Sequence, residues 1–160
     1  MKTAEDIMLD KRRDMITVGP DQTVRAALEV MRTHRIGAIL VRRAHKIVGI
    51  WTERDLARDI LAPGFDIDRA RVADHMTAKL FTAPHDTPIV KLLEMFLGLY
   101  VRHIVITRNR ETVGLLSIGD VLRASLLEKD LQIRGLTAAE PWQFYESWGA
   151  DREWKPPENH

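Results

Sequence analysis

Two short segments of the chain combine a glycine, a hydroxyl side chain and an aspartate at one shared spacing. They are GIWTERD at 49–55 and GLLSIGD at 114–120. In each segment a hydroxyl residue, Thr52 or Ser117, stands three positions before an aspartate, Asp55 or Asp120. A hydroxyl at the start of a helix lies among unpaired N–H groups and favours a phosphate. A carboxylate one helical turn later accepts hydrogen bonds from a diol, such as the two ribose hydroxyls.

The same spacing also suits helix capping, which needs no ligand. A Ser or Thr three residues before an acid is close to a capping box, although Glu or Gln is the usual acidic partner. The glycine likewise allows the close approach of either a neighbouring group or a ligand. For one segment alone, the two interpretations carry equal weight. Because the whole segment occurs twice, glycine included, ligand binding is favoured.

The duplication extends over most of the chain, at the offset of 65 residues that separates Asp55 from Asp120. Thr17 aligns with Thr82 at this offset, and no gap is needed anywhere. Each copy is predicted to form a strand, a helix, two further strands and a final helix. The predicted ranges are 16–18, 23–34, 36–41, 47–51 and 53–61 in the first copy, and 81–83, 89–99, 101–106, 112–116 and 119–127 in the second.

The predicted fold class is α/β, with two βαββα repeats packed around a pseudo-twofold axis into one module. One repeat of about 50 residues is marginal alone, so the two sheets are expected to pack together and share a core. The predicted boundaries are 1–65 for the first repeat, 66–75 for a linker made of a short helix and a loop, 76–128 for the second repeat, and 129–160 for a tail.

The predicted tail is rich in aromatic residues and departs from the repeat pattern. It holds Trp142, Trp148 and Trp154. The favoured interpretation is an arm that packs on its own module or on a dimer mate. The alternative is a docking segment for an unidentified partner protein, because aromatic residues dominate binding hot spots.

Several classes of protein chemistry are excluded or disfavoured by composition. The absence of cysteine excludes disulfides, thiolate metal sites and cysteine nucleophiles. The six histidines show no metal-ligand spacing, so no metal site is expected. The sequence lacks the P-loop, Rossmann and Gly-x-Ser-x-Gly motifs, and its acids form no positioned pair. No catalytic residue is assigned, and an enzyme is not expected.

Charge and hydropathy limit which binding partners and which cellular location are expected. There are 24 Lys plus Arg against 23 Asp plus Glu, and the two signs are interleaved along the chain. A nucleic-acid-binding protein usually has a basic excess or a basic face, so this class is disfavoured. No stretch approaches the roughly 20 apolar residues of a membrane-spanning helix, and the N-terminus has no signal-peptide pattern. A cytoplasmic protein without membrane association is expected.

The repeat pattern resembles a tandem pair of CBS domains, the repeats named after cystathionine β-synthase. The segments that carry the resemblance are RIGAILV (35–41), GIWTERDL (49–56), RHIVI (102–106) and GLLSIGDV (114–121). The resemblance spans roughly residues 4–127 and is strongest to small stand-alone bacterial proteins made of little else. It implies two clefts related by pseudo-symmetry, which bind adenosyl ligands such as AMP, ADP, ATP or S-adenosylmethionine.

The resemblance also implies which residues form each cleft. The family's ribose-binding aspartate falls on Asp120 or Asp55, and its phosphate-side hydroxyl falls on Ser117 or Thr52. The residues expected in the Asp120 cleft are Ile16, Thr17, Val18, Ile36, Gly37, Ala38, Leu115, Ser117, Gly119 and Asp120. Those expected in the Asp55 cleft are Phe81, Thr82, Ala83, Arg102, His103, Ile104, Ile50, Thr52, Arg54 and Asp55.

The two clefts are not expected to be equivalent. The wall at 36–38 is small and open to a flat base, so the Asp120 cleft is preferred for the nucleoside. In the other wall, Arg102 either pairs with a phosphate or fills the cleft when it is empty. Trp51 either stacks on a base or packs in the core, and core packing is favoured.

The leading hypothesis is a regulatory sensor that binds an adenosyl ligand and needs no other cofactor. The ligand would bias the relative orientation of the repeats, or of a homodimer formed through the helices at 23–34 and 89–99. Two alternatives stay open. One is a structural dimerisation module with empty clefts, and the other is a nucleic-acid-binding module.

Overall fold

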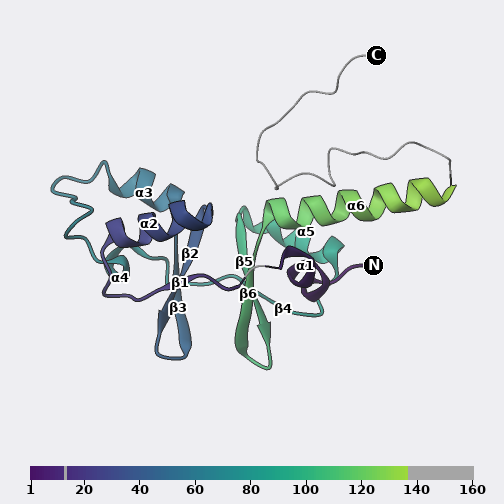
Figure 1. Cartoon of the computed structure of the whole chain (residues 1–160), viewed down its shortest axis with the longest axis horizontal. Helices are drawn as coiled ribbons and strands as arrows, with labels where there is room; N and C mark the ends of the chain where they lie inside the picture. Colours follow the sequence, from purple (N-terminus) through teal and green to yellow (C-terminus); the bar gives the residue numbers. More distant parts are fainter. Residues whose placement is uncertain (13, 137–160) are drawn as a thin grey trace, which may run out of the picture.

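The chain folds into two similar α/β halves that lie side by side (Figure 1). The computed structural model describes residues 1–12 and 14–136, so most of the predicted tail lies outside the described residues. In order, the elements are α1 Ala4–Lys11, β1 Thr17–Val18, α2 Val24–His34, β2 Ala38–Arg43, β3 Lys46–Thr52, α3 Glu53–Asp59, α4 Val72–His75, β4 Thr82–Pro84, α5 Ile89–Leu99, β5 His103–Arg108, β6 Glu111–Ser117 and α6 Ile118–Leu136. The predicted order of strands and helices is confirmed in both repeats.

Each half contains a three-stranded sheet with the same topology. The strand orders are β1-β2-β3 and β4-β5-β6, with the first pair parallel and the second antiparallel. The registers match at the 65-residue offset, because Thr17 pairs with Leu40 and Thr82 with Val105. Both antiparallel pairs also carry a register shift at the same place, after Val41 and after the residue that matches it in β5. The pseudo-symmetry therefore extends to backbone pairing.

The two sheets do not share one core, contrary to the expectation from repeat size. Two separate clusters of buried apolar residues occur among the described residues. The first surrounds Trp51, which is fully buried, and the second surrounds Phe96. Each sheet buries one face under helices packed against it, and the halves meet where β3 contacts β6. Core packing of Trp51 is confirmed.

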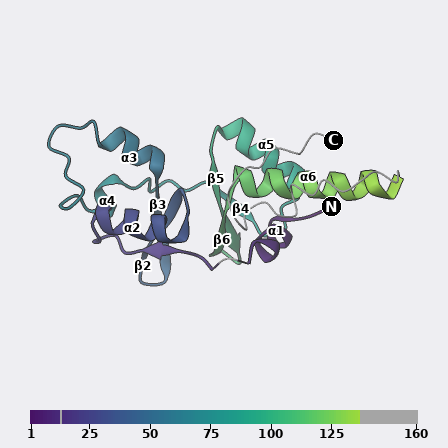
Figure 2. The same ribbon diagram turned by 45° about the horizontal axis from the view of Figure 1, so that its top comes forward.

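Helix α1 lies early in the chain but packs on the second sheet. Figure 2 shows it beside β6 and α6. Its residues Ala4 and Ile7 belong to the Phe96 cluster, and the N–H of Ala4 donates to the carbonyl of Thr87 at 2.9 Å. The expected linker precedes the second repeat in the sequence but packs on the first half, because its Val72 is buried in the Trp51 cluster. Helix α1 therefore ties the start of the chain to the second half, whereas the linker packs on the first half.

Among the described helices, none combines the length and the apolar character required to cross a lipid bilayer.

Candidate ligand-binding clefts

The first motif forms a complete capping box at the start of α3. The N–H and Oγ1 of Thr52 both donate to Oδ2 of Asp55, at 2.9 and 2.8 Å. The Oγ1 of Thr52 in turn accepts from the N–H of Asp55 at 3.3 Å. The reciprocal bonds satisfy helix-end donors and hold the carboxylate in one orientation. The capping interpretation is therefore correct for this motif.

The second motif repeats this geometry at the start of α6. The N–H and Oγ of Ser117 donate to Oδ2 of Asp120, each at 2.8 Å. The N–H of Asp120 donates back to Oγ of Ser117 at 3.2 Å. An aspartate thus takes the place of the usual Glu or Gln in both boxes. Capping is compatible with ligand binding, because a capped carboxylate is a pre-oriented acceptor.

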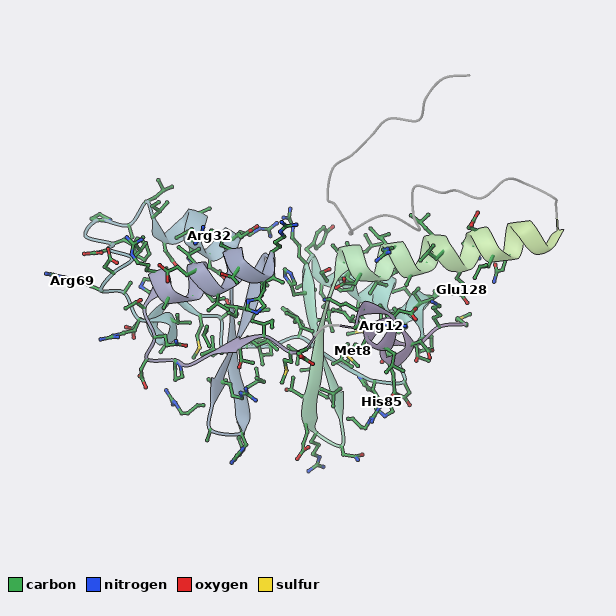
Figure 3. All side chains as sticks on the ribbon, in the orientation of Figure 1. Met8, Arg12, Arg32, Arg69, His85 and Glu128 are labelled. Atoms are coloured by element: carbon green, nitrogen blue, oxygen red, sulfur yellow. The ribbon has the colours of Figure 1, made fainter. Side chains whose placement is uncertain are left out.

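The glycine of each motif makes room for a methionine. A Cβ on Gly49 would lie 2.4 Å from Sδ of Met76, and a Cβ on Gly114 would lie 2.4 Å from Sδ of Met8. Figure 3 shows Met8 between α1 and β6. Of the two partners expected for these glycines, a neighbouring group or a ligand, the structure contains the neighbouring group.

The Asp55 cleft is a cavity of about 280 Å³ between the two halves. Its lining residues are Gly37, Ile50, Thr52, Glu53, Arg54, Asp55, Thr77, Lys79, Leu80, Phe81, Tyr100, Val101, Arg102, His103 and Val105. Ligand pockets usually have volumes of about 300–1,000 Å³, so this cavity is close to the size of a small-molecule site. Among the residues expected here, Ala83 and Ile104 are instead buried in the second core, and Thr82 is exposed and does not line the cavity.

The Asp55 cleft also contains residues that sequence reasoning did not assign. Lys79 and Leu80 come from the segment that joins the halves, and Tyr100 ends α5. Tyr100 adopts a left-handed backbone conformation with a φ of 53°, which turns the chain from α5 toward β5. The position of Tyr100 could not be found from spacing alone, because it follows from a turn that no glycine marks.

On the Asp120 side, the cavity of the cleft is much smaller, at about 90 Å³, and neither Asp120 nor Ser117 lines it. Its lining residues are Met8, Lys11, Asp14, Met15, Ile16, Ile36, Ala38, Leu40, Val113, Gly114 and Leu115. Four of the expected residues are among them, Ile16, Ile36, Ala38 and Leu115. Val18 is buried in the first core instead, and Gly37 lines the other cleft. The remaining expected residues, Thr17, Ser117, Gly119 and Asp120, are not among the residues that line this cavity.

A lysine from α1 lines this smaller cavity and is bound to Asp120. The Nζ of Lys11 lies 2.8 Å from Oδ2 of Asp120 and donates to the carbonyl of Leu115 at 3.3 Å. Burial alone would raise the pKa of Asp120. The charge of Lys11 and hydrogen bonds from Lys11 and Ser117 lower that pKa, and together they outweigh the effect of burial. The net result is a pKa below the ordinary value, so Asp120 is ionised at neutral pH.

His103 lines the Asp55 cleft as a neutral side chain. Burial lowers the pKa of its imidazole to about 4, and the positive charges of Lys11 and Arg102 add to this effect, whereas Asp120 opposes it. At neutral pH the ring therefore carries no charge. The cations that line the Asp55 cleft are Arg54, Lys79 and Arg102.

No group of three His, Asp or Glu side chains within residues 1–12 and 14–136 is arranged to hold a metal ion.

Known proteins share both the sequence pattern and the fold. The CBS domain family matches residues 4–62 and 72–127. The chain is 30% identical over 145 residues to the mitochondrial CBS domain-containing protein CBSX3 of Arabidopsis thaliana, covering 85% of this chain and 70% of the relative. Relatives from Methanopyrus kandleri and Acidianus ambivalens are covered over 58% and 66% of their own length.

Solved structures agree with this family. The CBS-domain containing protein ATU1752 from Agrobacterium tumefaciens is 33% identical, with a TM-score of 0.73, covering 78% of this chain and 99% of that structure. The CBS domain protein PAE2072 from Pyrobaculum aerophilum, solved in complex with AMP, shares the fold at 24% identity and a TM-score of 0.68, covering 79% of this chain and 97% of that structure. Two family matches, a matching fold and paired motifs agree, and the chain belongs to the CBS domain family.

Proposed function

We propose that the chain is a regulatory module, not an enzyme, and that it binds an adenine nucleotide in the Asp55 cleft. The observation that carries this proposal is a cavity of about 280 Å³ that holds a pre-oriented carboxylate at its wall. The preference differs from the one drawn from sequence, which favoured the Asp120 cleft. The smaller volume of that cleft and its bound lysine support the change.

The carboxylate of Asp55 suits the ribose diol. Its Oδ2 is held by Thr52, while its Oδ1 accepts from Nη1 of Arg58 at 3.2 Å. The side chain of Arg58 is 60% exposed, whereas that of Asp55 is only 14% exposed. Exposed ion pairs contribute little to stability, so exchanging Arg58 for ligand hydroxyls costs little. Asp55 is the residue on which we expect ligand affinity to depend most.

The charges around the cleft favour a phosphorylated ligand. Arg54, Lys79 and Arg102 bring three cations, against the carboxylates of Glu53 and Asp55. Arginine and lysine bind phosphate oxygens through charge-assisted hydrogen bonds. S-adenosylmethionine carries a sulfonium cation and no phosphate, so we propose that AMP, ADP and ATP bind more tightly than it does. The complex of PAE2072 with AMP supports the choice of nucleotide only through the shared fold.

The signal is proposed to pass through the arrangement of the halves and of a homodimer. A ligand between the halves contacts both of them, and it shifts their arrangement only if it binds one state more tightly. Helix α5 leaves Val90 51% and Leu97 69% exposed, on one face. Exposed apolar patches mark interaction sites. We therefore place the proposed dimer contact on α5, one of the two helices expected from sequence.

Calorimetric titration tests the nucleotide site. Purified protein is titrated with AMP, ADP, ATP and S-adenosylmethionine, beside Asp55→Ala and a control variant, Asp74→Ala. Asp74 is an exposed aspartate in α4, outside the cleft lining, so its loss changes the net charge equally. We expect heat from the nucleotides with the wild type and the control, and loss of binding with Asp55→Ala. Equal binding by Asp55→Ala and Asp74→Ala contradicts the proposed site.

A further inference from the structure

We infer that Lys11 is a built-in occupant of the Asp120 cleft, which limits the chain to one adenosyl ligand. The inference rests on the proposed function, because it concerns which of two related clefts is open to the same ligand. It begins from an ion pair within the chain, Lys11 with Asp120, at 2.8 Å.

The ammonium group of Lys11 competes for the carboxylate that a ribose would need. Oδ2 of Asp120 already accepts from Nζ of Lys11 and from the N–H and Oγ of Ser117. The side chains of Lys11 and Asp120 are only 27% and 22% exposed, so the pair is partly shielded from water. A neutral diol would have to displace a charged donor, and charge-assisted bonds are the stronger kind. The cleft is therefore closed to a nucleoside while Lys11 stays in place.

Lys11 is carried by an anchored helix, not by a loose chain end. Ala4 and Ile7 of α1 are buried in the second core. The Glu5 carboxylate is bound by Nδ1 of His85 at 2.9 Å and also pairs with Arg108. These contacts hold α1 on the second sheet. The last turn of the helix then presents Lys11 to Asp120, and Lys11 also lines the cavity of about 90 Å³.

The first half has a lysine at the same distance from its covering methionine, but the backbone there follows a different path. Met8 covers Gly114 as Met76 covers Gly49, and a lysine follows three residues later in both cases, Lys11 and Lys79. Met8 lies in a helix.

The segment after Met76 is extended instead. The N–H of Thr77 donates to the carbonyl of Ile50 at 2.8 Å, which fixes this segment beside β3. Lys79 is consequently exposed and lines the Asp55 cleft, while Asp55 pairs with Arg58. One lysine closes its cleft, and its counterpart borders an open one.

Ligand stoichiometry tests the inference. AMP and ATP are titrated calorimetrically into the wild type, Lys11→Ala, Lys11→Met and Lys11→Arg. Lys11→Met keeps most of the apolar stem, which protects against unfolding, and Lys2→Ala is a control that removes the same charge near the other end of α1. We expect one ligand per chain for the wild type, Lys11→Arg and Lys2→Ala. We expect two for Lys11→Ala and Lys11→Met, and one again when Asp55→Ala is added to Lys11→Ala.

The outcomes distinguish a failure of this inference from a failure of the proposed function. Two ligands per wild-type chain, or one ligand per chain for folded Lys11→Ala and Lys11→Met, overturn the inference and leave the Asp55 site intact. No binding by the wild type but one ligand for Lys11→Ala supports the inference and contradicts the Asp55 site. No binding by any variant overturns both. The wild-type stoichiometry alone remains decisive if the Lys11 variants do not fold, because a count of two overturns the inference.

Discussion

The N–H of Glu53 donates to the carbonyl of Gly37 at 3.1 Å, which joins the start of α3 to the segment that leads into β2. The pseudo-symmetric bond runs from Ile118 to the carbonyl of Arg102, at 3.0 Å. The two junctions thus have the same backbone hydrogen bond, but one carries a glycine and the other an arginine. Both Gly37 and Arg102 line the Asp55 cleft, so its two walls differ in charge although their backbones match.

Gly49→Ala is predicted to destabilise the fold. The new methyl group would meet Sδ of Met76 at 2.4 Å, and overpacking of this kind costs about 1–3 kcal/mol. Gly19→Ala is the matched control, because its Cβ would contact only Gln22, at 3.8 Å or more, and its φ is not positive. Urea unfolding should give a lower midpoint for Gly49→Ala and a change within about 0.5 kcal/mol for Gly19→Ala. Equal midpoints would show that Met76 moves aside at no cost.

His103 is predicted to make stability fall on acidification. Its pKa is about 4 when folded and 6.5 ordinarily, so between these values the unfolded chain binds more protons than the folded one. Stability is therefore lost as pH falls through this window, by about 2 kcal/mol between pH 7 and pH 5. Urea unfolding at both pH values should show a smaller loss for His103→Gln than for the wild type. An equal loss would assign the pH dependence to other groups.

Leu97→Lys is predicted to weaken the proposed homodimer. Leu97 is 69% exposed on α5, and a charge in the middle of an apolar contact should raise the dimer dissociation constant at least about tenfold. Leu61→Lys is the control, since Leu61 is 82% exposed in the first half, beyond α3. Light scattering should give a mass near 18.4 kDa for Leu97→Lys and about twice that for the control. A wild type that is already monomeric would remove the dimer from the account.

Much of the fold is predictable from the sequence, because local patterns determine most of its elements. Helix α5 has the predicted bounds, Ile89 to Leu99, since its apolar residues recur at helical spacing. Strand β5 begins two residues later than predicted, at His103, because Tyr100 turns the chain in a left-handed conformation. Such a conformation is uncommon for residues other than glycine, so sequence patterns seldom reveal it.

The long-range contacts are what the sequence does not reveal. Nothing in the spacing of α1 indicates that Ala4 and Ile7 join the second core instead of the first. The ion pair of Lys11 with Asp120 depends on that docking, because the two residues are 109 positions apart. The proposed choice of cleft consequently depends on a residue outside both motifs.

Backbone amide NMR shifts during titration with AMP test the proposed site most directly, because each motif is observed separately. We predict shifts at the amides of Thr52, Asp55 and Arg102, while the amides of Ser117 and Asp120 stay unchanged. Shifts confined to Ser117 and Asp120, or no shifts at all at saturating AMP, would contradict the account.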